Sequence, residues 1–192
     1  MLESLYTREQ PVEPDSLSDD GRSFTAVLTT EAAVPVYARD LNRAIDEVLL
    51  SSGVEFRNHL PVLNNHRRED ITDVLGAWDA PTRGDGQHLS RATLSMAQHV
   101  EPARDLVRDG ALRSVSVGYW PMEPIDLNPG EQTVVESRTY KAGPRGLRLA
   151  QKTMIFEGSI VPVGADPEAT IRALTVNHPS RGWLPWRRPL RG

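Results

Sequence analysis

A serine hydroxyl lies among small side chains in the strand that the sequence predicts over residues 111–120. Because side chains alternate across a strand, Val117 would face a core while Ser116 and Gly118 share the opposite face. That face leaves room for another backbone to approach the hydroxyl of Ser116. The pattern also fits a half-buried strand whose serine faces water. The glycine-flanked nucleophile elbow of the α/β-hydrolases is missing, because Ser114 stands two residues before Ser116.

A single charged residue, Glu157, interrupts the most apolar segment of the chain, residues 154–163. A carboxylate within an apolar strand is costly unless it is paired or hydrogen-bonded. We therefore expect a histidine or an arginine to contact Glu157, or else a strand edge at which the carboxylate faces water.

The histidines show no spacing that is typical of a metal site, and none forms a recognised cluster with acidic residues. His66 is the most informative, because the apolar run Leu60–Leu63 and a turn-favouring Asn pair lead to it and a predicted strand follows. A lone histidine is more often a surface residue or one that is satisfied in the core. The others are His59, His88, His99 and His178.

Short strands are the main elements that would position these residues. Strands are predicted over residues 23–30, 71–78, 89–97, 111–120 and 154–163. Residues 132–142 are also predicted to pair with residues 146–152 across the turn at Gly143–Gly146.

Helical spacing of apolar residues predicts helices over 41–50 and 100–107, the second ending at Gly110. A short strand near 45–50 is the alternative to the first helix. Asp166 is predicted to cap a short third helix. About seven strands with two or three helices predict an α+β fold that is mostly β, an antiparallel β-barrel with a few flanking helices.

Composition excludes several classes of function. The chain has no cysteine, which rules out disulfides, thiolate zinc sites and cysteine nucleophiles. No apolar stretch approaches the ~18 residues of a membrane span, and no signal-peptide pattern is visible, so we expect a cytoplasmic protein without a membrane partner. The arginines are scattered and lack interleaved aromatic residues, so nucleic-acid binding is not expected.

The two ends differ in charge and predict a three-part organisation. Residues 1–22 are rich in acids and lack periodicity, which predicts a disordered acidic tail. Residues 175–192 are rich in Arg, Pro and Trp and are expected to form a C-terminal tail. Residues 23–174 would form the folded domain.

Three segments, in a fixed order along the chain, carry a family resemblance. Leu60–His66 with Ile71–Gly76 has the form of a "plLxxH" stretch before a glycine-bearing strand, and Gly110–Tyr119 that of "GxlxxxSvGf". Phe156–Pro167 has the form "xExSxVpxpAxP". Together they resemble the histidine, nucleophile and glutamate segments of the prohead serine proteases of tailed bacteriophages, over roughly residues 23–174.

The resemblance implies an assemblin-like fold and a serine endopeptidase with Ser116 as nucleophile and His66 as general base. Glu157 would be the third catalytic residue, although the related herpesvirus assemblins use a second histidine there, which leaves His99 and His178 open. The implied substrates are the scaffold protein, the major capsid protein and the chain itself, cleaved inside the procapsid in the host cytoplasm. No cofactor or metal is implied. Because assemblins dimerise, a homodimer stays open.

Three other functions remain as alternatives. The first is a capsid-assembly protein of the same fold that has lost activity. The second is a metal-dependent hydrolase built from the histidines and nearby acids. The third is a β-barrel binding module, in which the spacing of the serine and histidine segments is a coincidence.

Overall fold

Most of the described chain is β-strand, gathered into three sheets of nine, four and two strands. The computed structural model describes residues 6–11, by their backbone alone, and residues 17–162. The helix predicted at Asp166 and the tail over residues 175–192 lie outside this range. No helix in the described ranges is long and apolar enough to span a membrane.

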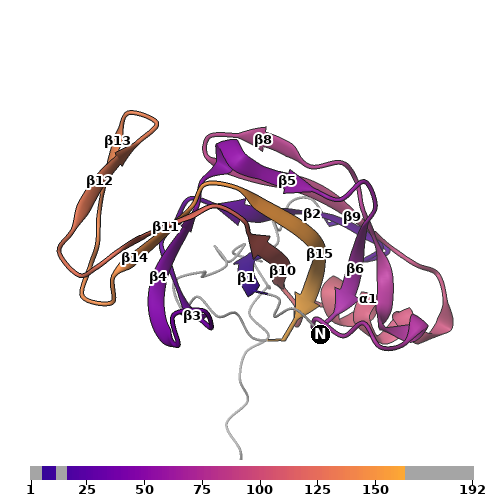
Figure 1. Cartoon of the computed structure of the whole chain (residues 1–192). Coiled ribbons are helices and arrows are strands. Elements are labelled where there is room, and N and C mark those ends of the chain that lie inside the picture. The colour runs from indigo at the N-terminus through magenta and orange to yellow at the C-terminus, as the bar shows by residue number, and fades with distance from the viewer. Residues whose placement is uncertain (1–5, 12–16, 163–192) are drawn as a thin grey trace, which may run out of the picture.

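The nine-stranded sheet carries Ser116 and Glu157, with His66 in the turn after its strand β6, and it curls into a half-barrel (Figure 1). Two short strands lie off its main path: one pairs with β15 and one with β9. The sheet runs in the order β1 (Tyr6–Pro11), β10 (Ser114–Pro121), β15 (Thr153–Val161), β6 (Leu60–Asn64), β7 (Val74–Trp78), β9 (Gln87–Leu94) and β2 (Ser23–Thr30), with β5 (Val54–Phe56) on β15 and β8 (Thr82–Gly84) on β9.

The mostly β class is confirmed, but the expectation of a closed antiparallel barrel is wrong. The end strands β1 and β2 form no ladder with each other among the described residues, so the sheet stays open. Pairing is also mixed, because β15 runs parallel to both β5 and β6. Parallel partners need long connections, which periodicity along the sequence does not reveal.

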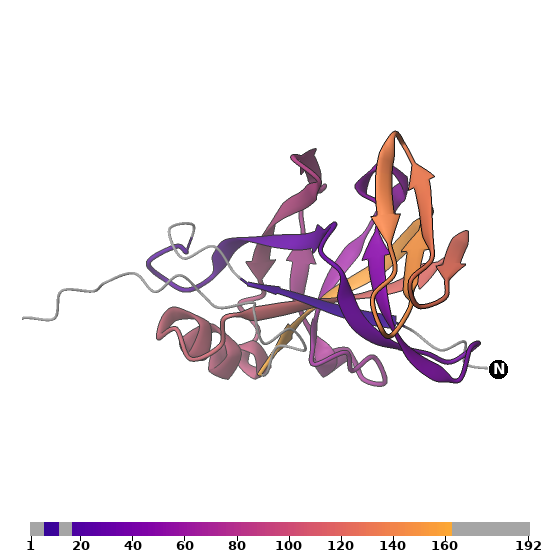
Figure 2. The same ribbon diagram turned by 90° about the vertical axis from the view of Figure 1, so that its left-hand side faces the viewer.

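The four-stranded sheet packs its own smaller core beside the half-barrel. The two-stranded hairpin extends away from the body of the molecule (Figures 1 and 2). The four strands are, in order, β11 (Pro124–Leu127), β14 (Leu147–Ala150), β4 (Arg43–Leu49) and β3 (Val34–Ala38), and the hairpin consists of β12 (Gln132–Val135) and β13 (Arg138–Lys141).

Helices are short and few in the described ranges. α1 (Glu101–Arg108) confirms the predicted helix, and Gly110 follows it with a positive φ of 72°. Residues 17–162 also contain three short 3-10 helices: η2 (Ser51–Gly53), η3 (Ile71–Asp73) and η4 (Gln98–Val100).

Four local predictions need correction. The strand predicted over residues 71–78 begins only at Val74, because Ile71–Asp73 form the 3-10 helix η3, which the side chain of Asp70 caps. The helix predicted over residues 41–50 is wrong and the alternative of a short strand near 45–50 is confirmed, because Arg43–Leu49 form strand β4 between β3 and β14. Residues 132–142 fold back on themselves as β12 and β13, and β14 pairs with β4 and β11 instead. Residues 6–11, within the expected disordered tail, form β1 against β10.

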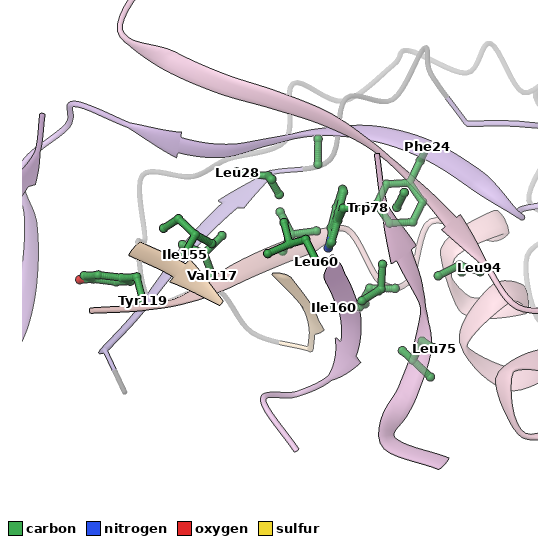
Figure 3. Packing of buried hydrophobic residues seen from close by; sticks show 14 of the residues in the cluster. Phe24, Leu28, Leu60, Leu75, Trp78, Leu94, Val117, Tyr119, Ile155 and Ile160 are labelled. Atoms are coloured by element: carbon green, nitrogen blue, oxygen red, sulfur yellow. The ribbon is translucent and has the colours of Figure 1, made fainter. Parts of the chain in front are cut away.

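The main core fills the concave side of the half-barrel (Figure 3). Phe24 and Trp78 meet edge to face with ring centroids 5.7 Å apart. On β10, Val117 and Tyr119 are fully buried in this core. The predicted alternation along β10 is therefore confirmed, and Ser116 lies on the face turned away from the core.

Trp78 fixes the backbone of β15 at the point where the candidate residues lie. Its indole Nε1 donates a hydrogen bond to the carbonyl oxygen of Gly158, at 3.1 Å, inside the core. A Cβ on Gly158 would come within 2.5 Å of that same nitrogen. Gly158 separates Glu157 from Ser159, so the fit of one indole against one glycine sets the position of both neighbours.

We expect Gly158→Ala to destabilise the fold by about 1–3 kcal/mol, the usual cost of overpacking a filled core. Gly84→Ala is the matched control, because a Cβ there meets nothing within 4 Å. Thermal unfolding followed by circular dichroism measures both. Equal midpoints for the two variants would show that the Trp78 contact does not constrain β15.

Candidate active site

Strand register places Ser116 and Glu157 on one face of the half-barrel. In the antiparallel pair β10–β15, Ser116 stands opposite Ser159, and Gly118 stands opposite Glu157. Side chains directly opposite each other share a face, with Cβ atoms about 4.5–5.5 Å apart. The small residues of β10 therefore lie beside the polar side chains of β15 on the same face of the sheet.

His66 reaches the same place from the end of β6. Strand β6 runs parallel to β15, with Leu63 opposite Ser159, and it ends at Asn64. Asn65 and His66 then adopt left-handed conformations with φ of 51° and 61°. For a histidine this is an uncommon backbone state that a tertiary contact must hold.

That contact is a closed ring of hydrogen bonds through Ser159. The backbone N–H of His66 donates to Ser159 Oγ at 3.0 Å, and Ser159 Oγ donates to Glu157 Oε2 at 2.7 Å. Glu157 Oε1 lies 2.7 Å from His66 Nδ1. Both the backbone and the imidazole of His66 are thus tied to one carboxylate.

The side chains of this ring are largely shielded from water. The side chain of Glu157 is 4% exposed and that of His66 is 22% exposed. An ionised carboxylate only accepts hydrogen bonds, so the contact of Glu157 with Nδ1 favours the tautomer in which Nδ1 carries the imidazole proton. Nε2 of the neutral ring is then the free acceptor, which is the atom a general base needs.

Ser116 is close to this ring but does not join it. It is 1% exposed, and its Oγ has no hydrogen-bond partner among the described residues. The structure thus brings His66 and Glu157 into direct contact, and places Ser116 across from Ser159 without a hydrogen bond to His66. In structures without substrate, catalytic hydrogen bonds are often long and tighten only on binding.

Ser159 is the residue that the sequence analysis missed. It belongs to the quoted glutamate segment, but no role was assigned to it. The signal was present, because Ser159 lies two residues after Glu157 and side chains two apart in a strand share a face. A second polar residue on the same buried strand face as a carboxylate is a candidate hydrogen-bond partner for that carboxylate.

The other histidines lie elsewhere. His88 is buried, with Nδ1 3.0 Å from Thr29 Oγ1, and burial lowers its pKa. His99 lies on the surface, with Nε2 3.2 Å from the carbonyl oxygen of Val74. Neither contacts Glu157, His59 is exposed, and His178 lies outside the described residues. Within those residues, no group of three or more acids and histidines could hold a metal ion.

A small pocket beside the turn at His66 does not open onto the sheet face that carries Ser116. Ala103, Leu112 and Ile160 are among the residues that line it. Ile160 follows Ser159 on β15 and points to the opposite, core side of the sheet. The pocket therefore opens on the wrong face for the serine hydroxyl.

In comparisons with protein-family models, curated proteins and solved structures, none matches this chain at a significant level. What the site can do is therefore argued from its own geometry.

We expect the neutral imidazole of His66 to carry its proton on Nδ1, as its contact with Glu157 requires. Long-range ¹H–¹⁵N NMR reads the tautomer directly. Glu157→Ala removes the acceptor and should abolish this preference, whereas Glu55→Ala, at an exposed position on β5, should leave it unchanged. A proton on Nε2 in the wild-type chain would contradict the assignment.

Proposed function

We propose that this chain is a serine endopeptidase in which Ser116 is the nucleophile, His66 the general base and Glu157 the residue that orients the base. The observation that carries the proposal is the ring joining His66, Glu157 and Ser159 beside a buried serine hydroxyl. A base held by a third group, next to a hydroxyl, is the general arrangement of nucleophilic catalysis.

In the proposed reaction, Ser116 Oγ attacks the carbonyl carbon of a peptide bond and loses its proton to His66 Nε2. The same proton then passes to the leaving amine as the C–N bond breaks, which leaves an acyl ester on Ser116. Water, deprotonated by His66, hydrolyses this ester and restores the serine. Glu157 stabilises the imidazolium at each stage through its hydrogen bond to Nδ1.

The family resemblance supplies the proposed setting. The substrates would be scaffold protein, major capsid protein and the chain itself, cleaved within a procapsid in the host cytoplasm. The catalytic domain would span residues 23–174, with an assemblin-like arrangement of strands around Ser116. Two findings support the alignment of motifs: His66 and Glu157, from segments 91 residues apart, are in contact, and Ser116 faces the same side.

A capsid-assembly protein of the same fold without activity is the second candidate. The observation that favours it is the state of Ser116, whose hydroxyl is buried and lacks a hydrogen bond to His66. A latent protease would show the same geometry before activation, so reactivity must separate the two.

Intact-mass analysis after treatment with a fluorophosphonate tests the proposal. We expect one adduct on the wild-type chain and none on Ser116→Ala or His66→Ala, because only an activated serine reacts. Ser90→Ala is the matched control, since this buried serine donates to the carbonyl of Asp79 and should not affect labelling. A folded wild-type chain that stays unmodified, alone and after co-expression with a capsid protein, would favour the inactive assembly protein.

We expect Ser159→Ala to lower kcat about 10–100-fold with little change in KM. Without the Ser159 hydroxyl, the imidazole of His66 would shift by a fraction of an ångström from the position that proton transfer requires. The proton on His66 Nδ1, read by NMR, should become less strongly localised, which a purely structural role would not produce. Ser159→Thr keeps the hydroxyl and should recover most of the rate. An unchanged kcat in Ser159→Ala would remove Ser159 from the site.

A further inference from the structure

Strand β10, which carries Ser116, has only one side at which another chain could pair. Its other side is bonded to β15 along the whole of Ser114–Pro121. The free side would be a sheet edge, with unpaired N–H and C=O groups that accept an extended peptide as an added strand. In this structure β1 occupies that side, from Tyr6 opposite Tyr119 to Pro11 opposite Ser114.

We propose that the β1 side of β10 is the binding site for an extended substrate peptide, and that β1 is an internal occupant which must leave before the substrate enters. The inference rests on the proposed function, because it names how a peptidase of this site would hold its substrate. A peptide that paired with β10 in place of β1 would run past Ser116, at the register position that Glu9 now holds.

Two further observations favour displacement of β1. Ser116 is 1% exposed, so no substrate reaches its hydroxyl in this conformation. Strand β1 is also the end strand of the sheet, and β10 is the one strand with which it forms a ladder among the described residues, although it lies near β2 as well. Strands held by a single ladder open at lower free energy than strands in the middle of a sheet.

The proposal can be tested on the full chain by pinning β1 in place. Pro11 and Ser114 are register partners, and paired Cα atoms in antiparallel strands are ~4.5–5.5 Å apart, within the range that a disulfide bridges. The chain has no cysteine of its own, so Pro11→Cys with Ser114→Cys gives one defined bond. The reduced form of the same variant is the matched control.

A second variant releases β1. N–H groups of adjacent residues in a strand point to opposite sides, so Arg8→Pro with Glu9→Pro removes at least one donor to β10. Circular dichroism establishes that the variant is folded. Two probes are used on every form: fluorescein-labelled peptide YTREQP, a copy of residues 6–11, followed by anisotropy, and fluorescently labelled casein, followed by cleavage.

We expect the released chain to bind the labelled peptide and to cleave casein at least about tenfold faster than the wild type, because the tethered strand no longer competes. The oxidised, pinned chain should bind no peptide and should cleave casein at least tenfold more slowly than its reduced form. Single-cysteine variants should not respond to oxidation.

Casein cleavage by the pinned chain at the rate of its reduced form would overturn the inference, as would a folded, released chain that binds no peptide. Failure of the proposed function looks different. In that case no form cleaves casein or reacts with a fluorophosphonate, while binding of the peptide still depends on whether β1 is pinned or released.

Discussion

The site depends on one buried carboxylate. Glu157 lies within a sheet at 3% exposure, where an unpaired charge would cost several kcal/mol. Both of its oxygens are satisfied, one by the imidazole of His66 and one by the hydroxyl of Ser159. Because Ser159 also accepts the backbone N–H of His66, the same requirement that stabilises the carboxylate fixes the turn that carries the histidine.

The rest of the half-barrel supports this arrangement through contacts on both faces of the sheet. On its core side, Trp78 packs against Gly158 and is hydrogen-bonded to its carbonyl, which fixes β15 between Glu157 and Ser159. On its outer side, β10 places Ser116 opposite Ser159 and Gly118 opposite Glu157, so that only small residues of β10 face the polar ring. His66 is thus held in one position, whereas Ser116 is buried and its hydroxyl has no hydrogen-bond partner among the described residues.

Sequence periodicity predicted the parts of the site that lie on strands with clear alternation. The faces of β10 follow from the contrast between Val117 and Ser116, and the need of Glu157 for a partner follows from its apolar neighbours. Periodicity could not reveal β1, whose six residues show no alternation, or the parallel pairing of β15 with β6, which joins segments far apart in the chain. The role of Ser159 required knowledge of which atoms the folded backbone brings within 3 Å.

The central claim is that His66 Nε2 activates Ser116 Oγ, and a crystal structure of the chain soaked with phenylboronic acid tests it most directly. We predict a covalent bond from boron to Ser116 Oγ, with His66 Nε2 within hydrogen-bond distance, about 3 Å, of the adduct. Boron bonded elsewhere, or Ser116 unmodified with Nε2 turned away from it, would contradict the account.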